Sequence, residues 1–267
     1  MVLELAPIVL GFIAGITVLL GALLILYSGR KASGTSLGFL NGLAGGVLAY
    51  LALEAGSKVS EYVEGLARLD TPADFLVAFI VTSVALIGKW LILAGVERRS
   101  ISSGGMSSSV LTATTVSIAL GLHNVGEGLA IAASLLAGRI ASALLFTVGF
   151  AVHNLTEGFA IAGPFFTRSP VKVVDKSLVS LVAGLSLLAG LPVAPGALVY
   201  YLGVSSELFT ATLLTIATAS IIYAMLHINL SALAKLGGVS GPLFWISIFS
   251  GIALAYTTET IILFSIP

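Results

Sequence analysis

The sequence contains no cysteine, and only 9% of its 267 residues are charged. The absence of cysteine excludes disulfides, thiolate metal ligands and cysteine redox chemistry. Ordinary soluble domains carry about 25% charged residues, so the scarcity of charge excludes that class. The 12 basic and 12 acidic residues balance, and no positive excess points to nucleic acid as a partner.

Hydrophobic residues make up 58% of the chain, and its mean hydropathy is +1.12. A helix needs about 20 apolar residues to cross a bilayer, and runs of that length recur throughout. The first, "APIVLGFIAGITVLLGALLILY", follows no basic residue and exceeds the length of a signal-peptide core, so we expect it to be retained. The sequence therefore predicts an all-α membrane protein, with residues 1–267 forming one multi-pass domain in contact with lipid.

Charges, glycine and serine clusters and prolines divide the chain into eight expected transmembrane helices. Their expected ranges are 7–27, 36–56, 74–96, 109–136, 140–166, 177–202, 207–231 and 241–264. The polar stretch "ERRSISSGGMSSS" predicts a flexible linker before the fourth helix. Pro192 and Pro195 predict a break in the sixth, because proline removes a helical hydrogen bond.

The loop charges predict the orientation of the helices. Most basic loop residues fall on the side of the first connection, and basic residues favour the cytoplasmic side. We therefore expect a cell-membrane protein with both termini extracellular. Helices 1–3 and 6–8 then run in opposite senses, which favours a 3+2+3 arrangement with an inverted repeat around helices 4 and 5.

Two nearly identical polar motifs interrupt the fourth and fifth helices. "HNVGEGLAIA" begins at His123 and "HNLTEGFAIA" at His153. Histidine and glutamate are four residues apart in each, so they share one helix face. A short connection makes the two helices antiparallel neighbours, and both motifs fall near mid-membrane. The pattern predicts one buried cluster of six side chains: His123, Asn124, Glu127, His153, Asn154 and Glu157.

An ionised carboxylate in hydrocarbon is costly unless it is paired, protonated or bound to a cation. Neither helix carries an arginine near its motif, whereas imidazole nitrogens and carboxylate oxygens suit divalent transition metals. We expect Zn²⁺ foremost, with Fe²⁺, Mn²⁺, Co²⁺, Ni²⁺ and Cd²⁺ as further candidates. The glutamates could bridge two ions, with the asparagine oxygens completing a second position. The alternative is that these residues only form hydrogen bonds between helices.

The motif region is also rich in glycine. Glycines lie at 121, 126, 128, 149 and 158. Small residues of this kind allow transmembrane helices to approach closely, or they could loosen the helix locally and expose carbonyl groups.

The two motifs resemble those on the fourth and fifth helices of the ZIP (Zrt/Irt-like) divalent metal transporters, whose usual forms are HNxPEG and H(E/N)xPEG. "GFLNGLAGGVLAYLALEAG" is similar to the second helix of that family, and "ASIIYAMLHINLSALAK" to the seventh. The resemblance implies that the histidines and glutamates are primary metal ligands, with Asn124 and Asn154 at a secondary position. It also implies an elevator-like movement.

The chain departs from that family at three places. Gly126 and Thr156 replace the motif prolines, and no acidic residue stands near Val193 and Ala194 in the sixth helix. The seventh helix reads "HINLSA" where an acidic stretch is common, although it keeps His227. These departures predict one well-formed metal site rather than two.

The resemblance implies a transporter that imports divalent metal, with zinc as the expected substrate, rather than an enzyme. His227 is then a candidate residue for the path by which the metal is released. The oligomeric state considered for the protein is a homodimer. The alternatives are an intramembrane metalloenzyme, whose usual ligand spacings are absent here, and a sensor protein stabilised by metal.

Other polar residues in or near the spans give weaker signals. An acidic group around the second connection, with Glu54 and Lys58 among its members, predicts either a negative mouth or a solvated loop. Lys89 is expected to extend toward the membrane surface, or to neutralise a buried glutamate. Asn41 and Glu259 are polar residues within spans and receive no predicted role.

Overall fold

The part of the chain that the structure describes is all helical. The computed structural model describes residues 2–29, 33–68, 72–103, 107–166, 174–201 and 207–264. The helices are α1 (Val2–Ser28), α2 (Gly34–Arg68), α3 (Pro72–Ser103), α4 (Ser108–Leu136), α5 (Ile140–Ala162), the 3₁₀ turn η2 (Gly163–Phe166), α6 (Lys176–Gly190), α7 (Val193–Tyr201), α8 (Glu207–Lys235) and α9 (Pro242–Phe264). The predicted all-α class is therefore confirmed.

Several of these helices are long and apolar enough to cross a bilayer. Within the described residues, seven helical stretches meet that description, from Ala6–Ser28 to Ala211–Lys235. Hydrocarbon offers no hydrogen-bond partner to the backbone, whereas a helix pairs its own NH and carbonyl groups. The chain is therefore a membrane protein with several candidate spans.

Two predicted helix ends, at residues 56 and 96, are wrong, because both helices continue further. α2 runs to Arg68, so Glu61 and Glu64 lie on a helix rather than in a loop. Lysine and glutamate four residues apart stabilise a helix surface, and Lys58 pairs with Glu54 in this way. α3 likewise runs to Ser103, through the first seven residues of the expected linker 97–109.

The predicted break in the sixth helix is confirmed. α6 ends at Gly190 and α7 begins at Val193, on either side of Leu191 and Pro192. The backbone NH of Ala194 donates to the carbonyl of Leu191, 3.0 Å away, in a tighter turn than an α-helix makes. The break divides the expected range 177–202 into two shorter helices.

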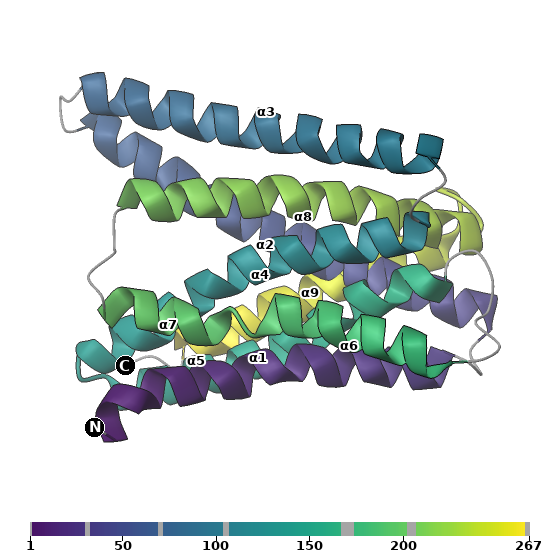
Figure 1. Cartoon of the computed structure of the whole chain (residues 1–267), viewed down its shortest axis with the longest axis horizontal. Coiled ribbons are helices and arrows are strands. Elements are labelled where there is room, and N and C mark those ends of the chain that lie inside the picture. The colour runs from purple at the N-terminus through teal and green to yellow at the C-terminus, as the bar shows by residue number, and fades with distance from the viewer. Residues whose placement is uncertain are drawn as a thin grey trace.

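The helices pack in two groups along the long axis of the molecule (Figure 1). In the first group, α2 packs against α8 and α9, and α3 packs against α8. In the second, α1 packs against α5, α6 and α7, while α4 packs against α5, α6 and α7. α4 also touches α8, and α5 touches α2 and α9, so the ligand-bearing pair α4 and α5 lies where the groups meet.

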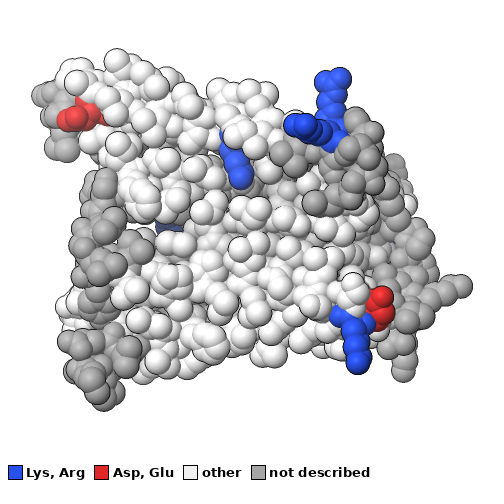
Figure 2. Space-filling model, viewed as in Figure 1, with Lys and Arg blue, Asp and Glu red and all other residues white. Residues whose placement is uncertain are grey.

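Charge is sparse over the middle of the molecule. On the face shown in Figure 2, most coloured side chains lie towards the two ends and the surface between them is almost uncharged. Large apolar side chains such as Leu53, Leu91 and Phe249 are exposed on the surface of the molecule. An exposed apolar band between polar ends is the surface that a bilayer requires.

Both described ends of the chain, at Val2 and Phe264, lie at the same end of the bundle (Figure 1). The basic residues Arg98, Arg99, Lys176 and Lys235 belong to helix ends at the opposite end. Arg30, Lys31, Arg168 and Lys172, which also support the predicted orientation, lie outside the described residues.

Candidate metal centre

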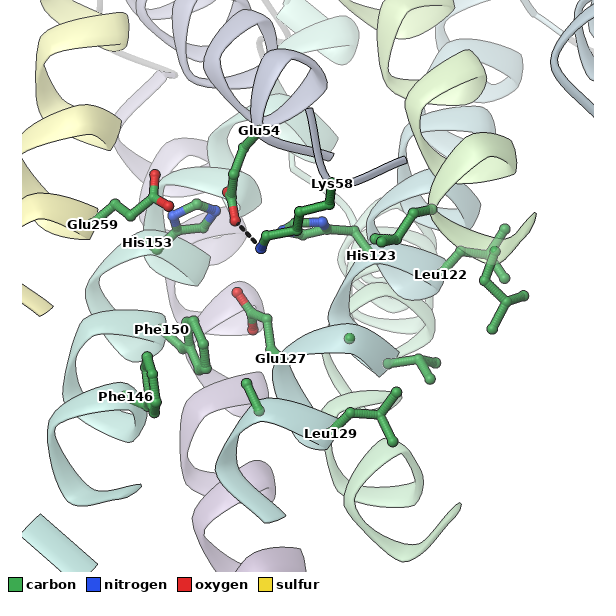
Figure 3. Close-up of a pocket in the computed structure, with 15 residues that line it drawn as sticks. Glu54, Lys58, Leu122, His123, Glu127, Leu129, Phe146, Phe150, His153 and Glu259 are labelled. Atoms are coloured by element: carbon green, nitrogen blue, oxygen red, sulfur yellow. Dashed lines mark hydrogen bonds and ion pairs between the residues drawn. The ribbon is translucent and has the colours of Figure 1, made fainter. Parts of the chain in front are cut away.

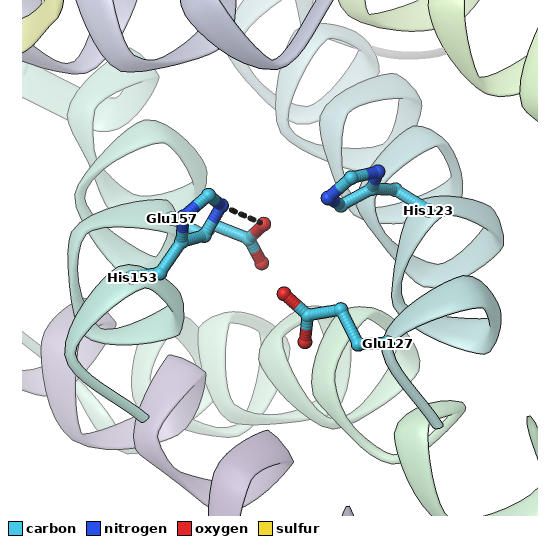
Figure 4. Close-up of side chains that lie close together, drawn as sticks. All are labelled: His123, Glu127, His153 and Glu157. Atoms are coloured by element: carbon cyan, nitrogen blue, oxygen red, sulfur yellow. Dashed lines mark ion pairs between the residues drawn. The ribbon is translucent and has the colours of Figure 1, made fainter. Parts of the chain in front are cut away.

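α4 and α5 bring both motifs together in the interior. The two helices pack against each other as an antiparallel pair, and only residues 137–139 connect them. His123, Glu127, His153 and Glu157 point toward one another from the two helices (Figure 4). Each can offer one ligand atom such that all four atoms lie within 4.8 Å of one another. This is the cluster that the motif spacing predicts.

The four side chains are almost completely withdrawn from solvent. His123 is 6% exposed, Glu127 5%, His153 9% and Glu157 0%. The two imidazole rings lie nearly parallel, with an interplanar angle of 21° and 6.1 Å between their centroids. Nε2 of His153 lies 3.5 Å from Oε1 of Glu157 on the same helix. The arrangement leaves a small gap bordered by two imidazoles and two carboxylates.

The two asparagines brace the carboxylates from opposite helices. Nδ2 of Asn124 on α4 donates to Oε2 of Glu157 on α5, at 3.1 Å. In the reciprocal contact, Nδ2 of Asn154 on α5 donates to Oε2 of Glu127 on α4, at 3.0 Å. Each carboxylate therefore has one oxygen fixed by an amide and the other, Oε1, available to a ligand.

The same amide groups tie the cluster to neighbouring helices. Asn124 Nδ2 also donates to the carbonyl of Ala189 on α6, and Asn154 Nδ2 to the carbonyl of Ala14 on α1. Those second contacts measure 3.1 and 3.3 Å. The cluster is thus held by four helices rather than two.

Six buried polar atoms of the cluster have no hydrogen-bond partner. They are His123 Nδ1, Asn124 Oδ1, Glu127 Oε1, His153 Nε2, Asn154 Oδ1 and Glu157 Oε1. Buried polar atoms are almost always paired, and an unpaired one costs about 1–3 kcal/mol. All six are donors to a metal by chemical type: imidazole nitrogen, carboxylate oxygen or amide oxygen. Two of these atoms, His153 Nε2 and Glu157 Oε1, lie 3.5 Å apart as an ion pair within α5. The set as a whole fits a divalent cation, and hydrogen bonds between helices alone do not account for it.

The last glycine of each motif sets how closely the outer helices approach. A Cβ atom on Gly128 would lie 2.0 Å from the carbonyl oxygen of Val193 on α7, and one on Gly158 would lie 2.3 Å from that of Val18 on α1. Only glycine permits these backbone contacts. Gly121 makes a similar approach to Leu188, whereas a Cβ on Gly126 would meet only the side chain of Leu214, at 4.0 Å. The expected close approach is therefore found, but toward α1, α6 and α7 rather than between α4 and α5.

The two replaced motif prolines leave the helices intact. α4 and α5 continue through residues 126 and 156 without interruption. Oγ1 of Thr156 donates to the carbonyl of His153 at 2.7 Å, within the same turn. At Val193 and Ala194 the structure has backbone packing and no carboxylate, and the group of four is the one such ligand cluster found in the ranges described above.

A cavity of about 340 Å³ opens beside the cluster (Figure 3). His123, Glu127 and His153 line one part of it, and α2 and α9 supply Glu54, Lys58 and Glu259. Phe146, Phe150, Leu213 and Leu214 contribute apolar walls. The cavity thus extends from the cluster to Lys58, whose side chain is 54% exposed.

From the sequence, Glu54 and Lys58 are expected near the connection between the second and third helices, and Glu259 has no predicted role. The structure instead places all three on the cavity wall, with Glu259 accepting a hydrogen bond from the hydroxyl of Tyr50. Tyr50, Glu54 and Lys58 follow one another at intervals of four residues, which marks one helix face. That spacing could have revealed them had α2 been expected to continue beyond residue 56.

Other predicted residues lie elsewhere. His227 is on α8, outside the group of four, with its ring 4.7 Å from that of Tyr223. Lys89 is half-buried on α3 and is not among the residues that line the cavity. Asn41 donates to Ser231 on α8 at 3.2 Å. The roles expected for His227 and Lys89 remain predictions.

Comparison with known proteins adds no assignment. No model of a protein family matches the sequence, and no curated protein matches it significantly. The residues of the site are therefore the basis for assigning a function.

Proposed function

We propose that this protein imports divalent transition metal ions, with zinc as the preferred substrate, across the cell membrane. The observation that carries the proposal is the buried group of His123, Glu127, His153 and Glu157. Their ligand atoms lie within 4.8 Å of one another, and each residue has a buried atom with no hydrogen-bond partner. Two carboxylates and two imidazoles at that depth match the ligand chemistry of Zn²⁺. A nearby cavity supports movement of the ion rather than permanent burial.

The resemblance of both motifs to those of ZIP transporters supports the same function. Under this proposal the chain has eight spans, α6 and α7 together forming the sixth. Both termini are extracellular, and α1–α3 and α6–α9 form an inverted repeat around α4 and α5. The common end of both termini and the basic helix ends opposite support this topology.

The residues suggest how an ion is bound and released. An ion that enters the cavity exchanges its water for the imidazole nitrogens and the Oε1 atoms of both glutamates. Asn124 and Asn154 hold the carboxylates in position through their second oxygens. Displacement of α4 and α5 with α1, α6 and α7 against the other group then exposes the ion to the opposite side, and His227 assists its release.

The experiment is zinc flux into sealed proteoliposomes containing the purified protein. We expect time-dependent Zn²⁺ accumulation by the wild type and none by Glu157→Gln, which removes a ligand charge but keeps the side-chain shape. Glu61→Gln is the matched control, because Glu61 is exposed on α2 and belongs to no ligand group. We expect it to transport normally.

The alternatives give different outcomes in the same preparation. A sensor protein stabilised by metal binds Zn²⁺ without accumulating it, and an intramembrane metalloenzyme binds metal and turns over a substrate. Saturable binding with no flux at any gradient would therefore overturn the proposal.

A further inference from the structure

Lys58 lies in the same cavity as the metal-ligand cluster. It stands on α2, one helical turn after Glu54, and its ammonium forms an ion pair with the Glu54 carboxylate. Both residues line the cavity together with His123, Glu127 and His153. Figure 3 shows the Lys58 side chain extending into this space, with its nitrogen on the side of Glu54 that faces Glu127.

The cavity has an excess of acidic groups, and Lys58 partly balances it. Its lining carries the carboxylates of Glu54, Glu127 and Glu259, and among the described residues that line it Lys58 is the one lysine or arginine. Glu157, the fourth residue of the cluster, adds a further carboxylate. Glu127 on the cavity wall is almost fully buried, and charges near a buried group interact more strongly than they do in bulk solvent. The position of the ammonium therefore affects any cation that binds nearby.

Lys58 is placed to move as well as to pair. Its side chain is 54% exposed, whereas that of Glu54 is 19% exposed. The lysine side chain has four flexible methylene groups and no fixed donor geometry. The ammonium can consequently turn away from the cluster while Glu54 stays in place.

We propose that Lys58 is a tethered counter-cation that competes with the transported metal for the negative charge of the site. Without metal, the ammonium offsets the acidic cavity. When a divalent ion binds, repulsion moves the ammonium outward, and its return favours release. Glu54 holds Lys58 within reach and thereby sets the strength of this competition. The inference rests on the proposed metal-binding function and identifies a residue that sets affinity without being a ligand.

The test measures the Zn²⁺ dissociation constant of purified variants by competition with a fluorescent chelator. We expect Lys58→Met to bind Zn²⁺ about tenfold more tightly, because one positive charge has left the cavity. Lys58→Arg keeps the charge and should stay within about threefold of the wild type. Lys176→Met is the matched control, since Lys176 is exposed at the start of α6, and we expect no change in its affinity.

A charge-neutral pair of changes separates competition from a structural role of the ion pair. Glu54→Gln should weaken binding about tenfold, because it removes a negative charge and leaves Lys58 uncompensated. The double variant Glu54→Gln with Lys58→Met should return toward wild-type affinity. An ion pair that merely stabilised α2 would instead make both single variants change in the same direction.

The outcomes distinguish this inference from the proposed function. If the wild type binds Zn²⁺ and Lys58→Met binds it equally or more weakly, the counter-cation role is wrong while the metal site stands. A double variant as weak as Glu54→Gln alone would also overturn it. If the wild type binds no divalent metal at all, the proposed function itself fails.

Discussion

Asn124 and Asn154 hold the two glutamates in position, which their place in the motifs alone does not indicate. Each amide donates to the glutamate of the opposite helix, so each helix positions the carboxylate of the other. Groups that hydrogen-bond to metal ligands fix their orientation and commonly change metal affinity by about 10–100-fold when removed. The two amide oxygens remain unpartnered, so direct ligation by asparagine, as the resemblance implies, remains a prediction.

Replacing Asn154 with alanine should weaken Zn²⁺ binding by about 10–100-fold. The change releases Oε2 of Glu127 and leaves the imidazole and carboxylate ligand atoms present. Asn41→Ala is the control, because Asn41 is also a buried asparagine within a span but contacts Ser231 rather than the cluster. Chelator competition on both proteins measures the difference, and equal affinities would argue against bracing.

Zn²⁺ affinity should decrease as the pH is lowered. A metal binds deprotonated imidazole and carboxylate, so protons compete with it at the same atoms. Free imidazole has a pKa of about 6.5, and two histidines take part. We expect at least about a tenfold loss of affinity between pH 7 and pH 5. Binding titrations at fixed ionic strength measure this loss, and an affinity independent of pH would exclude the histidines as ligands.

The helices that carry the ligands are joined to their neighbours by direct backbone contact. Gly158 on α5 meets α1 near Gly21, and Gly128 on α4 meets α7 near Gly196. Contacts of this kind leave no intervening side chains to deform, so α1, α4, α5 and α7 should behave as one rigid group. Any displacement of the metal site would then move these helices together.

Gly158→Ala should destabilise the protein, because the new Cβ would lie 2.3 Å from a backbone oxygen of Val18. Overpacking of this kind costs about 1–3 kcal/mol, which corresponds to a decrease in Tm of roughly 5 °C. The control is Gly184→Ala within α6, where a Cβ would meet nothing within 4 Å. Alanine favours a helix over glycine by about 0.5–1 kcal/mol, so that variant should be unchanged or slightly more stable. Thermal unfolding in detergent compares the two, and equal losses would mean that the contact is not tight.

The interior of the bundle contains a concentration of acidic groups. Glu127 and Glu157 are almost fully buried, and the nearest described lysine on the cavity wall pairs with Glu54 instead. Placing such carboxylates together costs several kcal/mol without a cation. The molecule should consequently be less stable without metal than with it.

Zn²⁺ should raise the Tm of the purified protein. A ligand at 100 times its dissociation constant stabilises the folded state by about 2.7 kcal/mol. The effect should disappear in the double variant Glu127→Gln with Glu157→Gln, whose own Tm without metal should be equal to or above that of the wild type. Differential scanning fluorimetry with and without a chelator measures both. A Zn²⁺-induced increase that persists in the double variant would place the binding elsewhere.

The sequence determined the class of the fold and the core of the site. Its apolar runs of about 20 residues have the length that a helix needs to cross hydrocarbon while satisfying its own backbone. The interval of four residues within each motif puts histidine and glutamate on one face whatever the neighbours do. Pro192 likewise fixes the break between α6 and α7, because its ring removes a backbone donor. These are local properties, and the sequence contains them in full.

The tertiary structure decided which distant residues join that site. Glu54, Lys58 and Glu259 reach the cavity only because α2 and α9 pack beside α4 and α5, which no local pattern specifies. The reciprocal bonds from Asn124 and Asn154 depend on the depth at which the two helices meet. The extension of α2 to Arg68 also escaped prediction, because a charged sequence ends an apolar run without ending a helix. Hydropathy marks where a chain leaves the hydrocarbon, whereas hydrogen bonding decides where its helix ends.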